Sequence, residues 1–264
     1  MKTDDKVLCR ITPPLAQIVF NRPKVGNAID SDSIRGFDRA LTQVAGDRTI
    51  HCLALTGSGN RLFVSGGDLK EFDQFQNPEE PRLMSLAMKR VLARIDALDI
   101  PVVGVMNGDA YGGGCEILLA CDYVIAREGT HLAFRQTAMG ISTGWGAATR
   151  LTRRVGRPQA IRILTTAATI EVNEALELGL VQEIVPGTNE DLQGRGKALS
   201  EQIASNAPLA IRACKRAVVQ SESMTLSDSI YAETDLFTIT WNSRDHQEAV
   251  RAFFDKRSPD FRGE

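Results

Sequence analysis

The stretch PVVGVMNGDAYGGGCEILLACDYVIA, residues 101–126, determines more of the fold than any other part of this sequence. An apolar run at Val102–Met106 leads toward three consecutive glycines, Gly112–Gly114, and a second apolar run follows at Tyr123–Ala126. Short apolar runs bounded by Pro, Asn and Asp are typical of buried strands. The stretch therefore predicts two buried strands with a glycine-rich turn and a helix between them.

The same alternation continues on both sides of this stretch. Further strands are predicted at Leu15–Phe20, Ile50–Thr56 and Val181–Val185, and helices at Ser31–Ala45 and Glu80–Leu98. Ser31 or Asp32 can cap the first of these helices. Strand–helix–strand alternation indicates an α/β core with parallel strand pairing.

The last part of the chain has a different pattern, because no strand is predicted after about residue 190. Helices are predicted at Asp191–Asn206, Leu209–Gln220, Thr225–Trp241 and Arg244–Lys256. We therefore divide the chain into an α/β core at residues 1–190 and a helical region at residues 191–264. Periodicity alone leaves open whether this region packs on its own core or on another subunit.

Composition excludes several classes of function. With 31 basic and 33 acidic residues among 264, the formal charge of −2 argues against a nucleic-acid partner. No apolar run approaches the about 20 residues that cross a membrane, and no export signal precedes the core. Five dispersed cysteines without CxxC spacing indicate reduced thiols, and no metal-binding spacing is present. We expect a cytoplasmic protein without a metal site.

Two glycine-rich segments are the candidates for chemistry. Residues 62–70 read LFVSGGDLK and residues 107–116 read NGDAYGGGCE, and each is predicted to follow a strand and to begin a helix. Helix starts have free backbone N–H groups, and glycine lets a ligand oxygen approach them closely. Two such donors on one oxygen would form an oxyanion hole. The alternative is two tight turns in which glycine supplies only a positive φ.

Glu116 is the candidate acid or base. It follows Gly113 by three residues, so it lies in the first helical turn beside the same N–H groups. A carboxylate there can transfer a proton. The alternative is a glutamate that only caps the helix or complements its dipole.

Five segments in order resemble the enoyl-CoA hydratase/isomerase (crotonase) superfamily. They are residues 21–28 (NRPKVGNA), residues 63–72 (FVSGGDLKEF), residues 101–126, the pair VGRPQA and EALELGLVQEIVP, and DHQEAVRAFFDKRSPDF near the C-terminus. The resemblance implies an α/β spiral of repeated ββα units with a C-terminal helical trimerisation region. It also implies a homotrimer or hexamer that acts on an acyl-CoA substrate, with coenzyme A as part of the substrate and no separate cofactor.

The resemblance also implies roles for individual residues. The N–H groups of Gly67 and Gly113 would form the oxyanion hole, and Glu116 would be catalytic. Contacts to coenzyme A would come from Lys24, Ser65 and Lys70. Phe253 and Lys256 would contact the coenzyme A that is bound to a neighbouring subunit. Ordinary solvated lysine is the alternative for Lys24, Lys70 and Lys256.

The sequence departs from the family at the second catalytic glutamate. Typical hydratases have it in a Phe-x-x-Pro-Glu segment, whereas residues 134–141 here read FRQTAMGI. Counting from Phe134 places Ala138 in the glutamate position, and counting back from Gly140 places Gln136 there. Arg135 beside them is either structural or a cation that faces the substrate.

The next segment resembles the ethylmalonyl-CoA decarboxylase branch through Met139-Gly140-Ile141, Trp145-Gly146 and Thr149-Arg150-Leu151. Decarboxylation forms the enolate without a base, and Trp145 could then be an apolar wall over the carboxylate; otherwise it is a core tryptophan. The leading hypothesis is hydratase-type action on a 2-enoyl-CoA. Decarboxylation of a methyl- or ethylmalonyl-CoA-type thioester, enoyl-CoA isomerisation and non-catalytic binding of coenzyme A are the alternatives.

Overall fold

A six-stranded sheet is the centre of the fold in the computed structural model, which describes residues 5–264. Its six strands are, in spatial order, β1 (Val7–Thr12), β2 (Leu15–Phe20), β3 (Cys52–Gly57), β5 (Val102–Met106), β7 (Tyr123–Arg127) and β10 (Glu183–Val185). Strands β1 and β2 pair antiparallel, and the other four pairs are parallel. The predicted α/β core with parallel pairing is confirmed.

A smaller sheet forms from strands that the sequence analysis did not predict. It contains β4 (Leu62–Val64), β6 (Asp109–Tyr111), β8 (His131–Ala133) and β9 (Thr169–Glu171), in that order. Strands β4, β6 and β8 each follow a strand of the larger sheet along the chain, and a helix comes next. This is the expected spiral of ββα units, in which three-residue strands are too short to show an alternating pattern.

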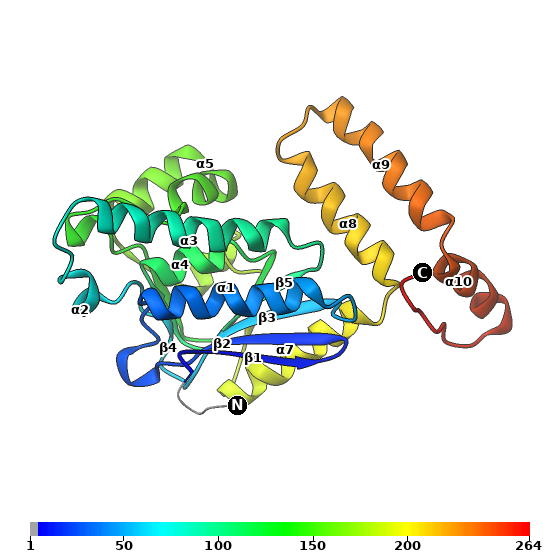
Figure 1. The fold of residues 1–264 in the computed structure, drawn as a ribbon, viewed down its shortest axis with the longest axis horizontal. Coiled ribbons are helices and arrows are strands. Elements are labelled where there is room, and N and C mark those ends of the chain that lie inside the picture. Colours follow the sequence, from blue (N-terminus) through cyan, green and yellow to red (C-terminus); the bar gives the residue numbers. More distant parts are fainter. Residues whose placement is uncertain (1–4) are drawn as a thin grey trace.

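Helices cover the larger sheet on both faces (Figure 1). Those of the core are α1 (Ser31–Gly46), α2 (Leu69–Phe72), α3 (Glu79–Ala97), α4 (Gly113–Leu119), α5 (Ala147–Thr166), α6 (Val172–Glu177) and α7 (Asn189–Ala204), with short 3-10 turns η1 (Pro23–Val25) and η2 (Thr137–Met139). Helix α7 packs with Leu192 against Val103 and Val105 of β5. The predicted boundary at residue 190 therefore falls inside a helix that contacts the sheet.

The cap of α1 differs from the expectation. Asp30, and not Ser31 or Asp32, is the N-cap residue, and its carboxylate accepts the Ser33 N–H at 2.8 Å. The Asp30 carboxylate also pairs with Lys6 at 2.6 Å and Arg22 at 3.2 Å. These two cations stabilise the charged cap, which a local sequence pattern does not reveal.

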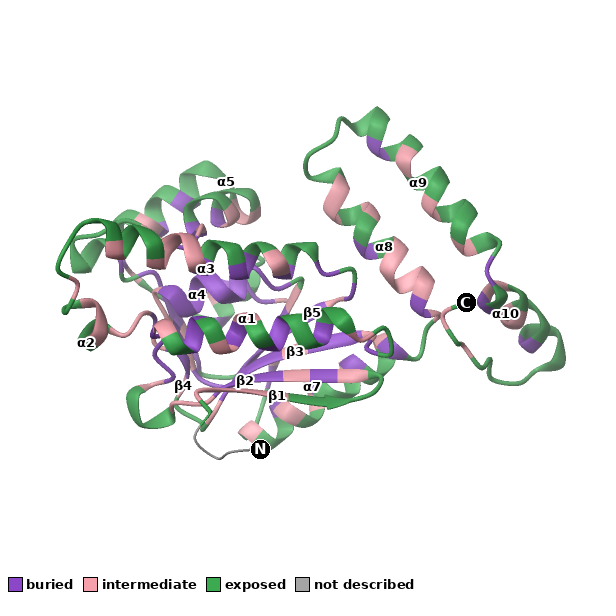
Figure 2. Cartoon of the chain, in the orientation of Figure 1, coloured by how far each residue is buried: buried purple, intermediate pink, exposed green. Residues whose placement is uncertain are grey.

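The last three helices extend to one side of the core (Figure 1), and the first of them is tied to the core where Lys215 pairs with Asp122 at 2.7 Å. Helices α8 (Pro208–Ser221) and α9 (Leu226–Trp241) run side by side in opposite directions, and α10 (Arg244–Asp255) follows. Their surfaces are mostly exposed or half-buried, whereas β3 and β5 in the middle of the larger sheet are mostly buried (Figure 2). Among residues 5–264, no helix is long and apolar enough to cross a membrane.

Candidate active site

The two glycine-rich segments meet in space. The first joins β4 to α2 and the second joins β6 to α4, and β4 and β6 are paired neighbours. A methyl group added at Gly66 would lie 3.4 Å from the Gly113 nitrogen. Gly66 has a φ of +109° and Gly112 a φ of +50°, which only glycine adopts readily. The tight-turn interpretation is therefore correct for these two glycines.

The next glycine in each segment presents a free N–H group. The Ile29 N–H donates to the Gly66 carbonyl, and the Ile29 carbonyl accepts the Asp68 N–H, each at 2.9 Å. The N–H of Gly67, between these two residues, therefore points away from Ile29. Gly113 is the first residue of α4, where an N–H has no partner within the helix. Neither N–H has an acceptor in the described part of the chain.

Aromatic rings lie directly against these two glycines. A methyl group at Gly67 would lie 2.2 Å from the Phe72 ring, and one at Gly113 would lie 2.0 Å from the Trp145 ring. Side chains at either position would displace a ring. The two glycines are therefore required by close packing rather than by a positive φ.

These groups line one cavity of about 460 Å³. Of the predicted site residues, the structure brings together there Ser65, Gly67, Gly113, Glu116 and Trp145. The cavity lining does not include Lys24, Lys70, Phe253 or Lys256. Lys24 and Lys70 are exposed, and Phe253 and Lys256 lie on and after α10, away from the core.

The rest of the lining is mainly apolar. It includes Phe72 of α2, Met84 of α3, Met139 of η2 and the loop residue Ile141. The sequence did not identify these four as site residues. Met84 belongs to the apolar face of a predicted helix, and periodicity does not distinguish a core methionine from one that borders a cavity.

Glu116 is buried at the floor of this cavity, with 2% of its surface exposed. Its Oε2 accepts the backbone N–H groups of Trp145 at 2.8 Å and Ala147 at 2.9 Å. Burial raises the pKa of the Glu116 carboxyl above its usual range, although these hydrogen bonds oppose the shift. Because Ala147 is the first residue of α5, the carboxylate caps α5 and not its own helix.

Gln136, and not Ala138, lies beside Glu116. Its Nε2 donates to Glu116 Oε1 at 2.9 Å, and the residue is 8% exposed. Ala138 lies in η2, is exposed and does not line the cavity. The two ways of counting left this open, and the structure favours the count from Gly140.

Arg135 also borders the cavity, but its guanidinium is engaged elsewhere. Nη1 donates to the Ala167 carbonyl and Nη2 to Thr169 Oγ1, both at 2.9 Å. These contacts tie the segment before η2 to the end of α5 and to β9. The structural alternative accounts for this arginine.

Trp145 is both a core residue and a wall of the cavity. It is 4% exposed, and its ring lies over Gly113. Its Nε1 lies 3.3 Å from the Met84 sulfur, and its backbone N–H holds Glu116. The two sequence-based interpretations of this tryptophan are therefore compatible.

Comparison with known proteins shows the family of this chain. A sequence model of the family described as enoyl-CoA hydratase/isomerase matches residues 10–264. The chain belongs to the enoyl-CoA hydratase/isomerase family. It is 34% identical to the crotonyl-CoA hydratase of Syntrophomonas wolfei, with 94% of each chain covered. It is 32% identical to the short-chain-enoyl-CoA hydratase of Clostridium acetobutylicum, with 92% of each covered.

A solved structure in this family has the same fold. The enoyl-CoA hydratase from Bacillus anthracis superposes with a TM-score of 0.94 at 31% sequence identity, over 98% of this chain and 100% of that one. The predicted superfamily and its crotonase-type fold are confirmed. The relatives named here are hydratases, so the likeness to the decarboxylase branch stays a prediction.

Proposed function

We propose that this chain hydrates a 2-enoyl-CoA thioester, with Glu116 as the acid and base and the N–H groups of Gly67 and Gly113 as the oxyanion hole. The observation that carries the proposal is the meeting of two unpaired backbone donors and one buried carboxylate in a single cavity. The hydratase relatives support the choice of reaction.

The chemistry follows from where charge develops. Addition of water to C3 of a 2-enoyl thioester moves negative charge onto the thioester oxygen. Two N–H donors directed at that oxygen stabilise the resulting enolate, and one such donor typically lowers the barrier by about 3–4 kcal/mol. Glu116 takes a proton from the water and delivers a proton to C2, a role that its raised pKa favours.

Coenzyme A would bind at the end of the cavity near Ser65. The Ser65 N–H donates to the Gly26 carbonyl at 2.9 Å, and Gly26 closes η1, the short turn that contains Lys24. Lys70 is exposed next to the cavity residue Leu69. We propose that Lys24 and Lys70 contact the anionic part of coenzyme A and that Trp145 borders the acyl group.

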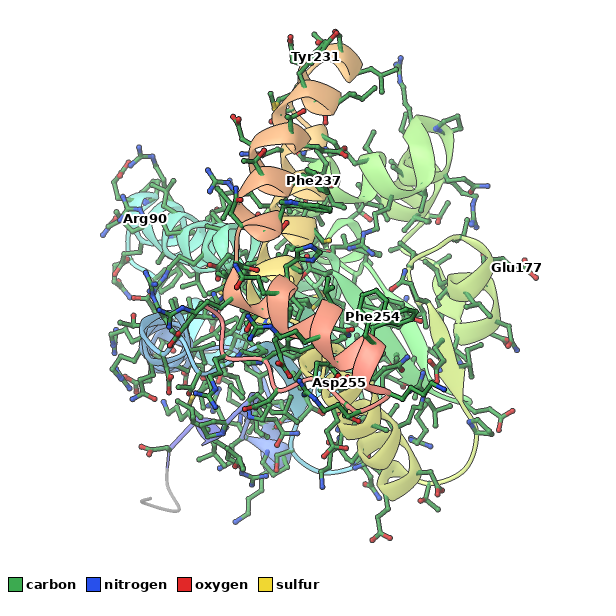
Figure 3. All side chains as sticks on the ribbon, turned by 90° about the vertical axis from the view of Figure 1, so that its right-hand side faces the viewer. Arg90, Glu177, Tyr231, Phe237, Phe254 and Asp255 are labelled. Carbon is green, nitrogen blue, oxygen red and sulfur yellow. The ribbon has the colours of Figure 1, made fainter. Side chains whose placement is uncertain are left out.

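We further propose a homotrimer or hexamer in which α8–α10 pack on neighbouring subunits. Tyr231 of α9 is 75% exposed and Phe254 of α10 is 76% exposed, and both side chains extend from the surface of this region (Figure 3). Large apolar patches of this kind mark protein interfaces. Phe253 and Lys256 would then reach coenzyme A bound to the adjacent subunit.

Double-bond isomerisation is the second candidate. It moves one proton from one carbon to another, which a single carboxylate can do, and Glu116 is the only carboxylate among the described residues that line the cavity. Both reactions place negative charge on the thioester oxygen, isomerisation by removal of a C2 proton from a 3-enoyl-CoA and hydration by addition of water to C3 of a 2-enoyl-CoA.

Mass-resolved product analysis tests these proposals. The protein and its Glu116→Ala variant are incubated separately with crotonyl-CoA, a 3-enoyl-CoA, and methyl- and ethylmalonyl-CoA. We expect crotonyl-CoA to gain one water with the wild type and not with the variant. Rearrangement of the 3-enoyl-CoA without hydration would favour isomerisation. Loss of carbon dioxide from a malonyl thioester, or no reaction at all, would contradict both.

A further inference from the structure

In the side-chain amide of Gln136, the nitrogen makes a hydrogen bond and the oxygen makes none among residues 5–264. Its Nε2 donates to Glu116 Oε1 at 2.9 Å. Its Oε1 is buried and has no hydrogen-bond partner among residues 5–264. Buried carbonyl oxygens are usually paired, so an unpaired one beside a catalytic carboxylate points to a donor that is bound only when the site is occupied.

The orientation of this amide is forced by its neighbour. An ionised carboxylate only accepts hydrogen bonds, so the NH₂ group of Gln136 must face Glu116. The carbonyl oxygen must then face away from Glu116, on a residue that lines the cavity. The terminal torsion of glutamine is soft, so a small rotation can direct Oε1 toward a small ligand inside the cavity while Nε2 keeps its hydrogen bond to Glu116.

The two oxygens of Glu116 differ in the same way. Oε2 accepts two backbone N–H groups, which occupy both of its lone-pair directions. Among residues 5–264, Oε1 accepts only Gln136 Nε2, so one lone pair remains. Oε1 is therefore the atom that can take a proton, and it is the oxygen next to the Gln136 amide.

We propose that Gln136 holds the attacking water: one proton of the water is accepted by Glu116 Oε1 and the other by Gln136 Oε1. The oxygen lone pair is then free to attack C3. A neutral acceptor thus replaces a second carboxylate, and one acid is sufficient for hydration. This inference rests on the proposed hydration reaction.

The step balances with one water and one carboxylate. The water oxygen bonds to C3 as its proton passes to Glu116 Oε1, and the electron pair of the double bond moves to the thioester oxygen. Glu116 then returns a proton to C2 as the carbonyl reforms. Gln136 Oε1 keeps its hydrogen bond to the remaining O–H, which becomes the 3-hydroxyl group of the product.

The alternative is that Gln136 only keeps Glu116 in place. Exchange of the C2 proton of butyryl-CoA with D₂O separates the two roles, because it needs Glu116 and the oxyanion hole but no attacking water. If Gln136 only positions the Glu116 carboxylate, the rates of hydration and of exchange should fall together when Gln136 is replaced.

The test compares Gln136→Met with wild type and with Gln43→Met, a control at an exposed position of α1. We expect hydration of crotonyl-CoA to fall about 100-fold in kcat in Gln136→Met, as for a misplaced reactant. Exchange of butyryl-CoA should stay near the wild-type rate. Equal losses in both reactions, or unchanged hydration, would overturn the inference.

The pH profile of Gln136→Glu gives a second readout. This variant restores an acceptor for water but places a second carboxyl beside Glu116, and two carboxyls so close cannot both ionise easily. Hydration should then require the singly protonated pair, so the wild-type acid limb should become a bell-shaped profile. A profile of unchanged shape would contradict the inference.

The other ionisable groups near Glu116 and Gln136 do not account for the acid limb of the pH profile. Burial raises the pKa of Tyr111 to about 12, and burial raises the pKa of the Cys115 thiol above its usual range.

The experiment also separates the two levels of the proposal. A wild-type protein that exchanges the C2 proton of butyryl-CoA but never hydrates crotonyl-CoA would overturn both the proposed hydration and the bound water. Normal hydration by Gln136→Met would overturn only the role of Gln136.

Discussion

The two glycine turns supply the same kind of backbone donor in very different surroundings. The turn between β4 and α2 leads into a four-residue helix in which Leu69 and Lys70 are exposed. The turn between β6 and α4 leads into a helix whose seven residues are all buried. One side of the proposed oxyanion hole can therefore adjust, whereas the side that carries Glu116 is fixed.

The largest effect is expected from Glu116, a side chain with no counterpart at the turn between β4 and α2. Glu116→Gln keeps the shape of the side chain but removes the base, so kcat for hydration should fall about 10³-fold. Steady-state assays with crotonyl-CoA measure this loss. Glu177→Gln, at an exposed position of α6, is the matched control and should leave kcat unchanged. Similar kcat values in both variants would show that Glu116 is structural.

Gly113→Ala tests how rigid the buried side is. The added methyl group would lie 2.0 Å from the ring of Trp145, a large side chain that is 4% exposed and packs in the core. We expect the free energy of unfolding to fall by about 3 kcal/mol, at the upper end for an overpacked core. Urea denaturation measures the change. A loss close to zero would mean that the Trp145 ring can relax.

Gly67→Ala makes the same change on the adjustable side. Its methyl group would lie 2.2 Å from the ring of Phe72, which is only half-buried on the short helix α2. The ring can turn outward, so the free energy of unfolding should fall by only about 1 kcal/mol. The same denaturation experiment gives the comparison. Equal losses in the two alanine variants would contradict the difference between the two sides.

The smallest expected effect is a shift of the pH profile. Burial raises the pKa of Glu116, and the ionised form is the proposed base. The value of kcat/KM should therefore fall as pH decreases through a pKa above the usual range of glutamate. A pH titration of kcat/KM with crotonyl-CoA measures the limb. Its persistence in the residual activity of Glu116→Gln would assign it to another group.

Much of this arrangement could be predicted from the sequence, because the long strands and amphipathic helices have clear periods. Strand Val102–Met106 was predicted with its observed bounds. The three-residue strands of the smaller sheet were missed because alternation needs a longer run. The glycines and Glu116 were found through their motif, since glycine-rich helix starts are visible locally.

Other features depend on contacts between distant segments. Counting from Phe134 and counting back from Gly140 place different residues at the position of the second glutamate. Only the backbone of η2 shows that Gln136, and not Ala138, lies beside Glu116. That Glu116 caps α5 depends on a contact between residues 116 and 147. The cavity walls Phe72 and Met84 could not be separated from ordinary core residues by pattern alone.

The central claim is that the two turns direct their N–H groups at one thioester oxygen. The most direct test is the infrared carbonyl stretch of a carbonyl-labelled 2-enoyl-CoA bound to the Glu116→Gln variant, which should retain both glycine donors but not turn over rapidly. Two donors in a water-excluded site should polarise the carbonyl, so we predict a stretch at lower frequency than that of the same thioester in water. A frequency equal to or above the value in water would contradict the oxyanion hole.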